Sequence, residues 1–433
     1  MVVTEEREVP GRPEARSALI GPLTALACLA VWIGIFNVLG YARWGSGPLH
    51  FSLLVLAIAL WGARRPIARL LPRWQHRFST RSVRGVAIIA CALYLAYLVG
   101  LHAWFFPKAL GGPMYDIGRN SLTAAQHLFE HGDNPYRSPS QLGLNVSQAE
   151  NVEFDLGRIR MFGVPYYYGY PYLPVMFLTY EPFRRVVGRD AIRVGNLALL
   201  LASIVGVAWL GLRLAEPGRE ALTAVFAVTA LLGPLDLTHE LYSRCVTDFV
   251  VSAFLLYGVI ALSRERFVAG GVLVGLAQSA KFLPGGIFLV LLSAWALGRE
   301  GGWRFVAAGA ATVAGVVLPF VLWDPEAFLS ATILYYVTVH AGGDSSSLWF
   351  FLPDALKGPF LLLGLLIVAS LCLWTLVRYR SDLTLVVRMA CLAWLVFCAF
   401  NVMTHLNYIW AIWAVASASF AIDLCRTTRT EDI

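Results

Sequence analysis

The chain has 433 residues, of which 58% are hydrophobic and 14% are charged, and its formal net charge is +7. Soluble domains carry about a quarter charged residues, so this composition excludes an ordinary soluble protein and indicates a polytopic membrane protein. The positive charge could suggest a nucleic-acid partner, but seven arginines lie between residues 64 and 84 and flank apolar runs, as in the cytoplasmic loops of membrane proteins. We therefore expect membrane lipids as partners and no nucleic acid.

Apolar runs that approach or exceed the roughly 20 residues needed to cross a bilayer recur along the chain. The candidate spans are 19–39, a second run that follows His50, 83–106, 171–187, 194–212, 221–236, 246–262, 268–280, 282–298, 303–323, 357–377, 384–401 and 405–424. These segments number thirteen, whereas two cytoplasmic termini require an even number. Either the proline-bearing segment 171–187 does not cross, or the pair around "KFLPGG" is one interrupted helix.

Arginine placement predicts the orientation of the chain. Residues 1–17 and 425–433 are expected to be cytoplasmic tails, which puts two large segments, 107–170 and 324–356, on the outer face of the membrane. The abundance of Arg, Ala, Gly and Val suits a high-GC bacterium, so we expect a bacterial plasma membrane. All 433 residues are expected to form one integral membrane domain.

The first outer segment contains "PMYDIGRNSLTAAQHLFEHGDNPY", where an acid stands ahead of a helical pattern. Leu122, Ala125, Gln126 and Phe129 predict an amphipathic helix of about fifteen residues that ends at Gly-Asp-Asn-Pro. Asp116 at its start has two interpretations. It caps the free N–H groups of the helix, or it is a catalytic carboxylate.

The chain shows no pattern typical of metal or nucleotide binding. The seven cysteines fall mostly inside apolar runs without CxxC spacing, so they are expected to pack as small apolar side chains. No cluster of histidine and glutamate has the spacing of metal ligands, and neither a P-loop nor a dinucleotide-binding fingerprint is present. We therefore expect no metal site and no cofactor.

Several short motifs together resemble glycosyltransferase family 87. They are the acid before the amphipathic helix, the "HGDNPY" turn, "YGYPYLP", "RERFVAGGVLVGLAQSAKFLPGGIFLVLL" and "THLNYIWAIWAV". The resemblance covers roughly residues 110 to 425. It implies an all-α GT-C-like bundle of about 12 (12–13) transmembrane helices, with outer-face loops that carry short amphipathic helices. Two motifs depart from the family: "HELYSRCVTD" stands where a Gly-Gln is usual, and "GDSSSLW" stands for an Asn-Gln-Ser-like motif.

The resemblance implies an activity as well. Family members transfer mannose or arabinofuranose from a polyprenyl-phosphate sugar, and the acceptor is a lipid-linked or cell-envelope glycan. An inverting single displacement at the outer face needs one carboxylate as general base, and Asp116 is the candidate. The alternative is a polyprenyl-lipid flippase or a secondary transporter, for which intramembrane charges would line a translocation path.

Cations are required to hold the donor phosphate. Lys281 lies between two apolar stretches, where a lysine costs about 2.5–3.5 kcal/mol on insertion scales, so it binds the phosphate or extends to the membrane surface. On the first interpretation Lys281→Met weakens donor binding and leaves folding nearly intact. Arg244 either binds the phosphate or pairs with Asp248, four residues later in the sequence. His405 is a further candidate to donate a hydrogen bond to the phosphate. The expected substrate-binding residues are Arg119, Asn120, Tyr168, Tyr170, His340 and Asp344.

Overall fold

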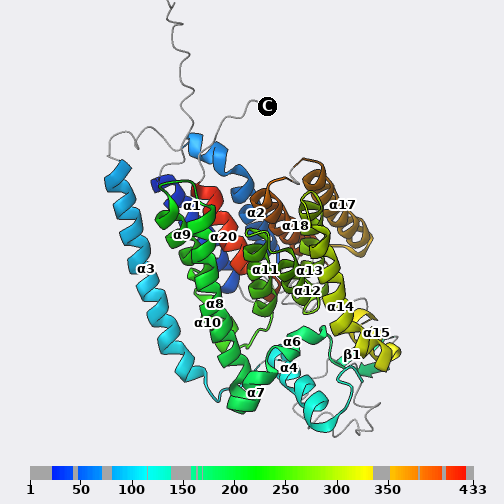
Figure 1. Cartoon of the computed structure of the whole chain (residues 1–433). Coiled ribbons are helices and arrows are strands. Elements are labelled where there is room, and N and C mark those ends of the chain that lie inside the picture. The colour runs from blue at the N-terminus through cyan, green and yellow to red at the C-terminus, as the bar shows by residue number, and fades with distance from the viewer. Residues whose placement is uncertain are drawn as a thin grey trace, which may run out of the picture.

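The structure is a computed structural model that describes residues 22–41, 47–70, 80–114, 116–137, 158–161, 164–167, 169–334, 352–378, 381–401 and 406–425. It is a bundle of helices with one small β-hairpin (Figure 1). The longer helices are α1 (Pro22–Tyr41), α2 (Gly47–Leu70), α3 (Thr80–Ala109), α8 (Ala191–Leu214), α9 (Glu220–Leu232), α11 (Phe249–Leu262), α12 (Phe267–Gln278), α13 (Phe282–Leu297), α14 (Trp303–Trp323), α17 (Asp354–Arg378), α18 (Leu383–Phe400) and α20 (Trp413–Cys425).

Short elements connect these helices. They are α4 (Asp116–Gln126), the π-turn η2 (His127–His131), α6 (Pro174–Leu178), α7 (Glu181–Val187), η3 (Gly188–Asp190), α10 (Asp236–Tyr242), α15 (Pro325–Leu329), η4 (Ser330–Leu334) and α19 (Leu406–Trp410). Strands β1 (Arg158–Met161) and β2 (Val164–Tyr167) pair antiparallel, with Arg158 opposite Tyr167. The predicted all-α polytopic class is confirmed, with this hairpin as an addition.

Five helical segments in the described part of the chain are long and apolar enough to cross a membrane, or six if the bent pair α9 and α10 counts as one span. Six shorter apolar helices, among them α11, α12 and α13, run alongside them (Figure 1). Side chains on the outer face of α17, such as Leu363, Leu366 and Leu373, are exposed. An exposed leucine face of this kind suits contact with lipid tails.

The structure decides which of the thirteen candidate segments forms no straight span. Residues 171–187 form the two short helices α6 and α7, because Thr179 and Tyr180 separate them in a turn. The alternative of one interrupted helix around "KFLPGG" is wrong, since α12 and α13 are separate helices that pack on each other across the short link 279–281. The observed broken span is α9 with α10, which meet at 61°.

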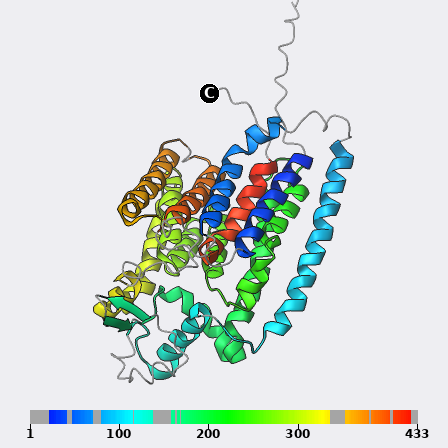
Figure 2. The ribbon, with the colours of Figure 1, turned by 180° about the vertical axis from the view of Figure 1, so that it is seen from behind.

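Most of the short elements lie at one end of the bundle. Figure 2 shows α4, α6, α7, α15 and the hairpin together below the long helices. Arg137 in the first predicted outer segment pairs with Asp324 at the start of the second, with Nε and Oδ2 2.9 Å apart. The two segments expected on the outer face therefore lie at the same end.

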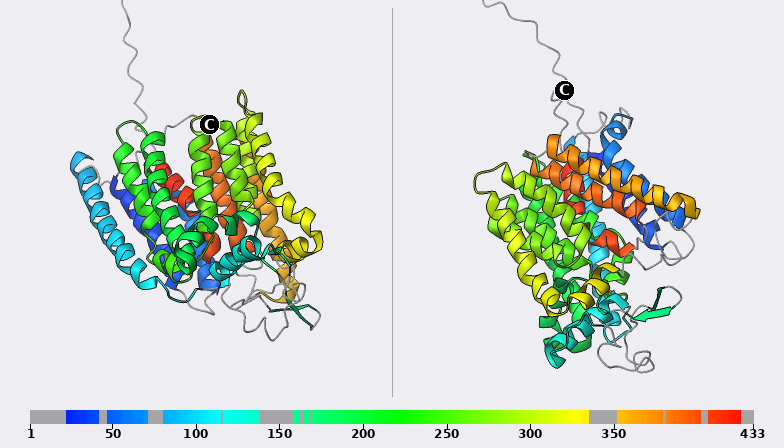
Figure 3. Two further views of the ribbon diagram at one scale, coloured as in Figure 1. Left: turned by 60° about the horizontal axis from the view of Figure 1, so that its bottom comes forward. Right: turned by 90° about the vertical axis from the view of Figure 1, so that its right-hand side faces the viewer.

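The first two helices pack against the last one. Trp32 of α1 stacks on Phe420 of α20 with ring centroids 4.4 Å apart, and the indole of Trp61 in α2 donates to Asp423 at 2.9 Å. Aromatic pairs of this geometry add about 0.5–1.5 kcal/mol beyond their buried area. Helices α17 and α18 form one flank of the bundle, and α3 lies on the other (Figures 1 and 3).

Candidate functional site

The amphipathic helix predicted after Asp116 is present. Helix α4 begins at Asp116 and continues through η2 to His131, and Gly132 then ends it with a left-handed φ of 69°. Glycine takes this conformation without the penalty of a Cβ. The side chain of Asp116 lies outside the described part of the structure, so its role as cap or base is not decided by contacts.

Helix α4 is pressed against the link between α10 and α11. A Cβ added at Gly118 would lie 2.6 Å from Cβ and 2.7 Å from the carbonyl oxygen of Cys245, so only glycine fits. Cys245 has a positive φ of 57°, which is strained for a residue with a side chain and is often found at functional sites. The start of α4 is thereby fixed against the chain just ahead of Asp248.

The two aromatic motifs of the sequence meet beside α4. The Tyr170 N–H donates to the Pro135 carbonyl at 2.9 Å, and the Tyr136 hydroxyl donates to the Tyr172 carbonyl at 2.9 Å. Tyr170, buried with 3% of its surface exposed, has its hydroxyl 2.9 Å from Ser121 Oγ on α4. Tyr170 therefore holds α4 in place, a structural role beside the predicted substrate contact.

Lys281 is buried and paired. Its ammonium forms an ion pair with Asp248, and it lies 3.7 Å from the ring centroid of Tyr408. The second oxygen of Asp248 accepts a hydrogen bond from the Asn407 amide at 2.8 Å. The snorkelling interpretation is wrong, because Lys281 is only 7% exposed. The ion pair argues against the expectation that Lys281→Met leaves folding intact, since the change would leave a buried carboxylate without its cation.

The backbone around Lys281 is held by α6. The N–H of Val175 donates to the carbonyl of Ser279 at 3.1 Å, and Lys281 itself is the extended residue ahead of α13. Pro284 falls in the first turn of α13, where N–H groups lack helical partners in any case. The break between α12 and α13 is residues 279–281, and Pro284 does not interrupt α13.

Arg244 pairs with Glu240 rather than standing on one helix face with Asp248. Arg244 and Asp248 lie on the link between α10 and α11, because the chain turns at Cys245. The Arg244 guanidinium donates to Glu240 at 2.7 Å, and its side chain is 42% exposed. It remains a candidate for the donor phosphate because it reaches the surface of the protein.

Arg193 joins the segments around the site. It is fully buried and donates to the carbonyls of Gly112, Pro113 and Tyr242 and to the carboxylate of Asp190, at 2.7–2.8 Å. It therefore ties the segment before Asp116 to α8 and to the end of α10. Sequence analysis did not single out Arg193. Its position at the start of an apolar run is the one feature of the sequence that could have indicated a buried, bonded arginine.

Buried polar atoms without hydrogen-bond partners occur on α4 and on residues next to Lys281 and Asp248 or bonded to them, as well as elsewhere, for example at Ser203 and Trp295. In the described part of the chain they include Arg119 Nε, Asn120 Oδ1, Thr247 Oγ1, Gln278 Oε1, Ser279 Oγ and Asn407 Oδ1. An unsatisfied buried polar atom costs about 1–3 kcal/mol, so a group of them indicates a place where water or a ligand supplies the missing bonds. Arg119 and Asn120, both predicted for the substrate, belong to this group.

Four predicted residues cannot be placed. Tyr168, His340, Asp344 and His405 lie outside the described residues. Asn407 and Tyr408 were missed, although they follow the predicted His405 in "THLNY".

The expectation of no metal-ligand cluster also overlooked Asp236, His239 and Glu240, whose side-chain ligand atoms all lie within 4.8 Å of one another. Their spacing at i, i+3 and i+4 was the available signal.

Comparisons with known proteins assign no family. No protein-family model matches the chain, and no curated protein matches it. Two solved structures of ArnT from Cupriavidus metallidurans are similar. The one bound to undecaprenyl phosphate has a TM-score of 0.47 and 20% identity over 77% of this chain and 60% of that chain. The apo structure has a TM-score of 0.43 and 19% identity over 78% and 61%.

This chain thus spans about 60% of the length of ArnT. A likeness with a TM-score below 0.5 assigns neither a fold family nor an activity. The resemblance to family 87 consequently rests on the sequence motifs alone.

Proposed function

We propose that this chain is a membrane glycosyltransferase that moves a sugar from a polyprenyl-phosphate donor to a lipid-linked or cell-envelope glycan at the outer membrane face. The observation that carries the proposal is the group of unpartnered buried polar atoms around the Lys281–Asp248 pair and α4. A site for a phosphate-linked sugar needs many hydrogen-bonding groups within an apolar surrounding.

The reaction proposed is a single displacement at the anomeric carbon. Asp116 takes the proton of the acceptor hydroxyl as that oxygen attacks, and the polyprenyl phosphate leaves from the opposite face with inversion. One carboxylate is sufficient, because no covalent intermediate forms. The contact of Gly118 with Cys245 supports this arrangement, since it brings the helix that begins at Asp116 to the segment that carries Asp248.

Lys281 is proposed to hold the leaving phosphate. An ammonium has three N–H donors, and Asp248 uses one of them, so the others are available to phosphate oxygens. Asp248 holds the lysine in position while the donor is absent. Arg244 and His405 are proposed as further cations or donors for the same phosphate, whose negative charge increases in the transition state.

Arg119, Asn120, Tyr168, Tyr170, His340 and Asp344 are proposed for the sugar and the acceptor. The unpartnered atoms of Arg119 and Asn120 lie on α4 close to Asp116 in sequence, where an acceptor would enter. The family resemblance favours mannose first and arabinofuranose next. The enzyme would then be a hexosyltransferase or a pentosyltransferase that needs no cofactor.

The test is transfer by the purified protein. Polyprenyl-phosphate mannose and, separately, polyprenyl-phosphate arabinose are incubated with the protein and membrane glycolipids, and products are identified by mass. Asp116→Asn should lower turnover by about 10²–10⁴-fold with normal expression, whereas loss of a cap alone costs about 1 kcal/mol of stability. Asp133→Asn, on the same outer segment, is the matched control and should retain turnover.

The transporter alternative makes a different prediction. In proteoliposomes it predicts movement of the labelled polyprenyl lipid between leaflets without any new glycosidic product. If Asp116→Asn kept normal turnover, the base would have to be sought at Asp133, Asp155 or Asp344. Absence of product with both donors, together with leaflet movement, would replace the glycosyltransferase proposal with transport.

A further inference from the structure

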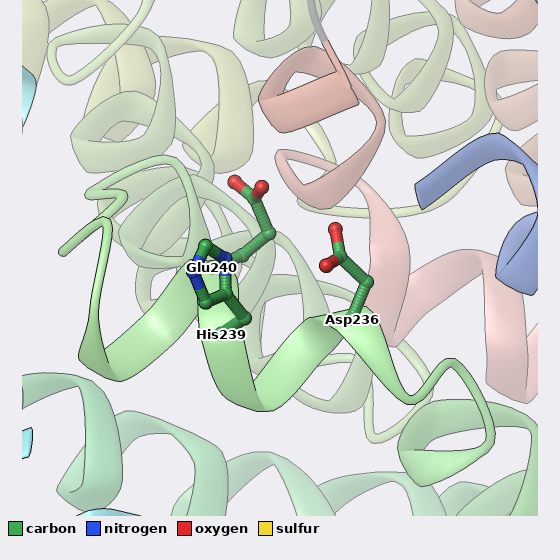
Figure 4. Close-up of side chains that lie close together, drawn as sticks. All are labelled: Asp236, His239 and Glu240. Carbon is green, nitrogen blue, oxygen red and sulfur yellow. The ribbon is translucent and has the colours of Figure 1, made fainter. Parts of the chain in front are cut away.

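Three potential metal ligands lie together on α10. Asp236, His239 and Glu240 occupy positions i, i+3 and i+4 of this helix, which share one face. One ligand atom of each residue lies within 4.8 Å of the others (Figure 4). A helix can hold two metal ligands at i and i+4 on one face, as in the H-E-x-x-H motif.

The two carboxyl groups need a cation or a shared proton between them. Asp236 and Glu240 are 9% and 1% exposed. A carboxylate oxygen of Asp236 and one of Glu240 lie within 4.8 Å of each other. Ionised carboxylates only accept hydrogen bonds, so two of them in contact repel unless a cation or a shared proton lies between them.

Arg244 compensates for one of these charges. It donates to Glu240 Oε1 at 2.7 Å, and one guanidinium cannot neutralise two carboxylates. His239 adds a half-buried imidazole whose ring packs edge-on to Phe105 of α3, with centroids 6.4 Å apart. A neutral imidazole does not balance a carboxylate, but it is a metal ligand.

We propose that Asp236, His239 and Glu240 bind one divalent transition-metal ion. An imidazole with two carboxylates suits Zn²⁺ or Mn²⁺ better than Ca²⁺, which prefers oxygen ligands alone. Three protein ligands leave positions open to water or to an anionic ligand. The site is separate from the residues assigned to the proposed transfer reaction, apart from Arg244, which neighbours both.

The last residue of α10 contacts segments that lead toward α4. Tyr242, the last residue of α10, packs on Phe106 near the end of α3, and its carbonyl accepts a hydrogen bond from Arg193 near the start of α8. These helix ends lead directly into η3 and the segment before α4. A metal at this position would add positive charge to the face on which Arg244 is exposed.

The experiment measures metal binding directly on the full-length protein in detergent. The purified protein is freed of metal by chelation and dialysis and titrated calorimetrically with Zn²⁺ and, separately, Mn²⁺, and bound Mn²⁺ is also counted by electron paramagnetic resonance. One ion per chain is expected, and it should raise the thermal unfolding midpoint. Asp236→Asn and His239→Ala should each weaken binding at least tenfold and abolish the thermal shift.

Controls separate this site from adventitious binding. His127 and His131 lie on one turn beside Asp133, so the double variant H127A/H131A must retain the ion. Asp236→Asn keeps the size of the side chain, which guards against misfolding of the alanine variant. If neither ion binds, or if binding survives in both α10 variants, the proposal is overturned and the two carboxyls share a proton instead.

Discussion

Lys281 illustrates at the scale of single residues how a buried charge depends on its partner. The pair with Asp248 joins residues 33 apart in sequence, and Asn407 completes it from a position 159 residues away from Asp248. Removing one member of such a pair leaves an uncompensated buried charge, which costs about 3–5 kcal/mol, whereas removing both costs far less.

We therefore predict that Lys281→Met lowers the free energy of unfolding by about 3–5 kcal/mol. The double variant K281M/D248N should recover most of that loss, because the asparagine that replaces Asp248 is neutral and still accepts from Asn407. Denaturant titration in micelles measures both values. Lys108→Met, at an exposed lysine stacked on Trp104, is the control. Equal losses in the single and double variants would rule out the ion pair as the cause.

Gly118 is the second residue whose identity the packing requires. A Cβ there would lie 2.7 Å from the Cys245 carbonyl oxygen, a backbone atom that no side-chain rotation can move away. Gly118→Ala should cost about 1–3 kcal/mol through overpacking, and it should reduce activity because α4 shifts. Gly100→Ala in α3, where no atom lies within 4 Å, should be neutral or slightly stabilising. Thermal unfolding of the two variants provides the comparison, and similar midpoints would contradict the contact.

At the scale of elements, the links between short helices depend on a few polar contacts. Asp324 accepts from the Ala327 N–H and so caps α15, and it pairs with Arg137 from the first outer segment. Partial burial raises the pKa of the Asp324 carboxyl, but the Ala327 N–H and the Arg137 guanidinium lower it more, to below its ordinary value of 3.8. The sequence alone did not indicate this link between residues 187 positions apart.

This pKa predicts a pH dependence of stability. Because the folded-state pKa lies below the unfolded value, the contact stabilises the protein above pH 3.8 and is lost as the pH falls through the lower folded pKa. The pair is partly exposed, so the contribution is below about 1 kcal/mol. Asp324→Asn and Arg137→Gln should lower the thermal midpoint near neutral pH, and the difference from the wild type should shrink in acid. Glu326→Gln, at an exposed acid on α15, should show no such convergence, and a pH-independent difference for Asp324→Asn would refute the assignment.

At the scale of the whole molecule, α4, α6, α7, α15 and the hairpin lie at one end of the bundle (Figure 2), and arginine placement predicts that this end is the outer one. We predict that single cysteines at Glu130 and Glu326 react with a membrane-impermeant thiol reagent in intact cells. Cysteines at Glu265 and Glu300, in exposed turns of the opposite end, should react only after permeabilisation. All four substitutions are made in a background without the seven native cysteines. Labelling of residues 265 and 300 in intact cells would invert the topology and place the proposed site in the cytoplasm.

Much of this architecture was predictable from the sequence because it depends on local patterns of residues. Apolar runs give helices, since a backbone in a bilayer must satisfy its own hydrogen bonds. Asp116, the amphipathic pattern and Gly132 predicted α4 and the residue where the helix ends to within a few residues. Segment 171–187 was ambiguous for the same reason, because its apolar content resembles a span while Pro174 and the turn at Thr179 and Tyr180 divide it.

The sequence by itself determined the class of the protein and the position of α4, and it singled out Lys281 as an unusual charge, because each depends on composition or on neighbours along the chain. Only the tertiary structure decided that Lys281 pairs with Asp248, that Arg244 pairs with Glu240, and that Gly118 faces Cys245. In each case the spacing in the sequence allowed several acids or neighbouring segments as the partner. The choice among them was made by the turn at Cys245, where a positive φ directs Arg244 toward α10 and Asp248 toward the buried lysine.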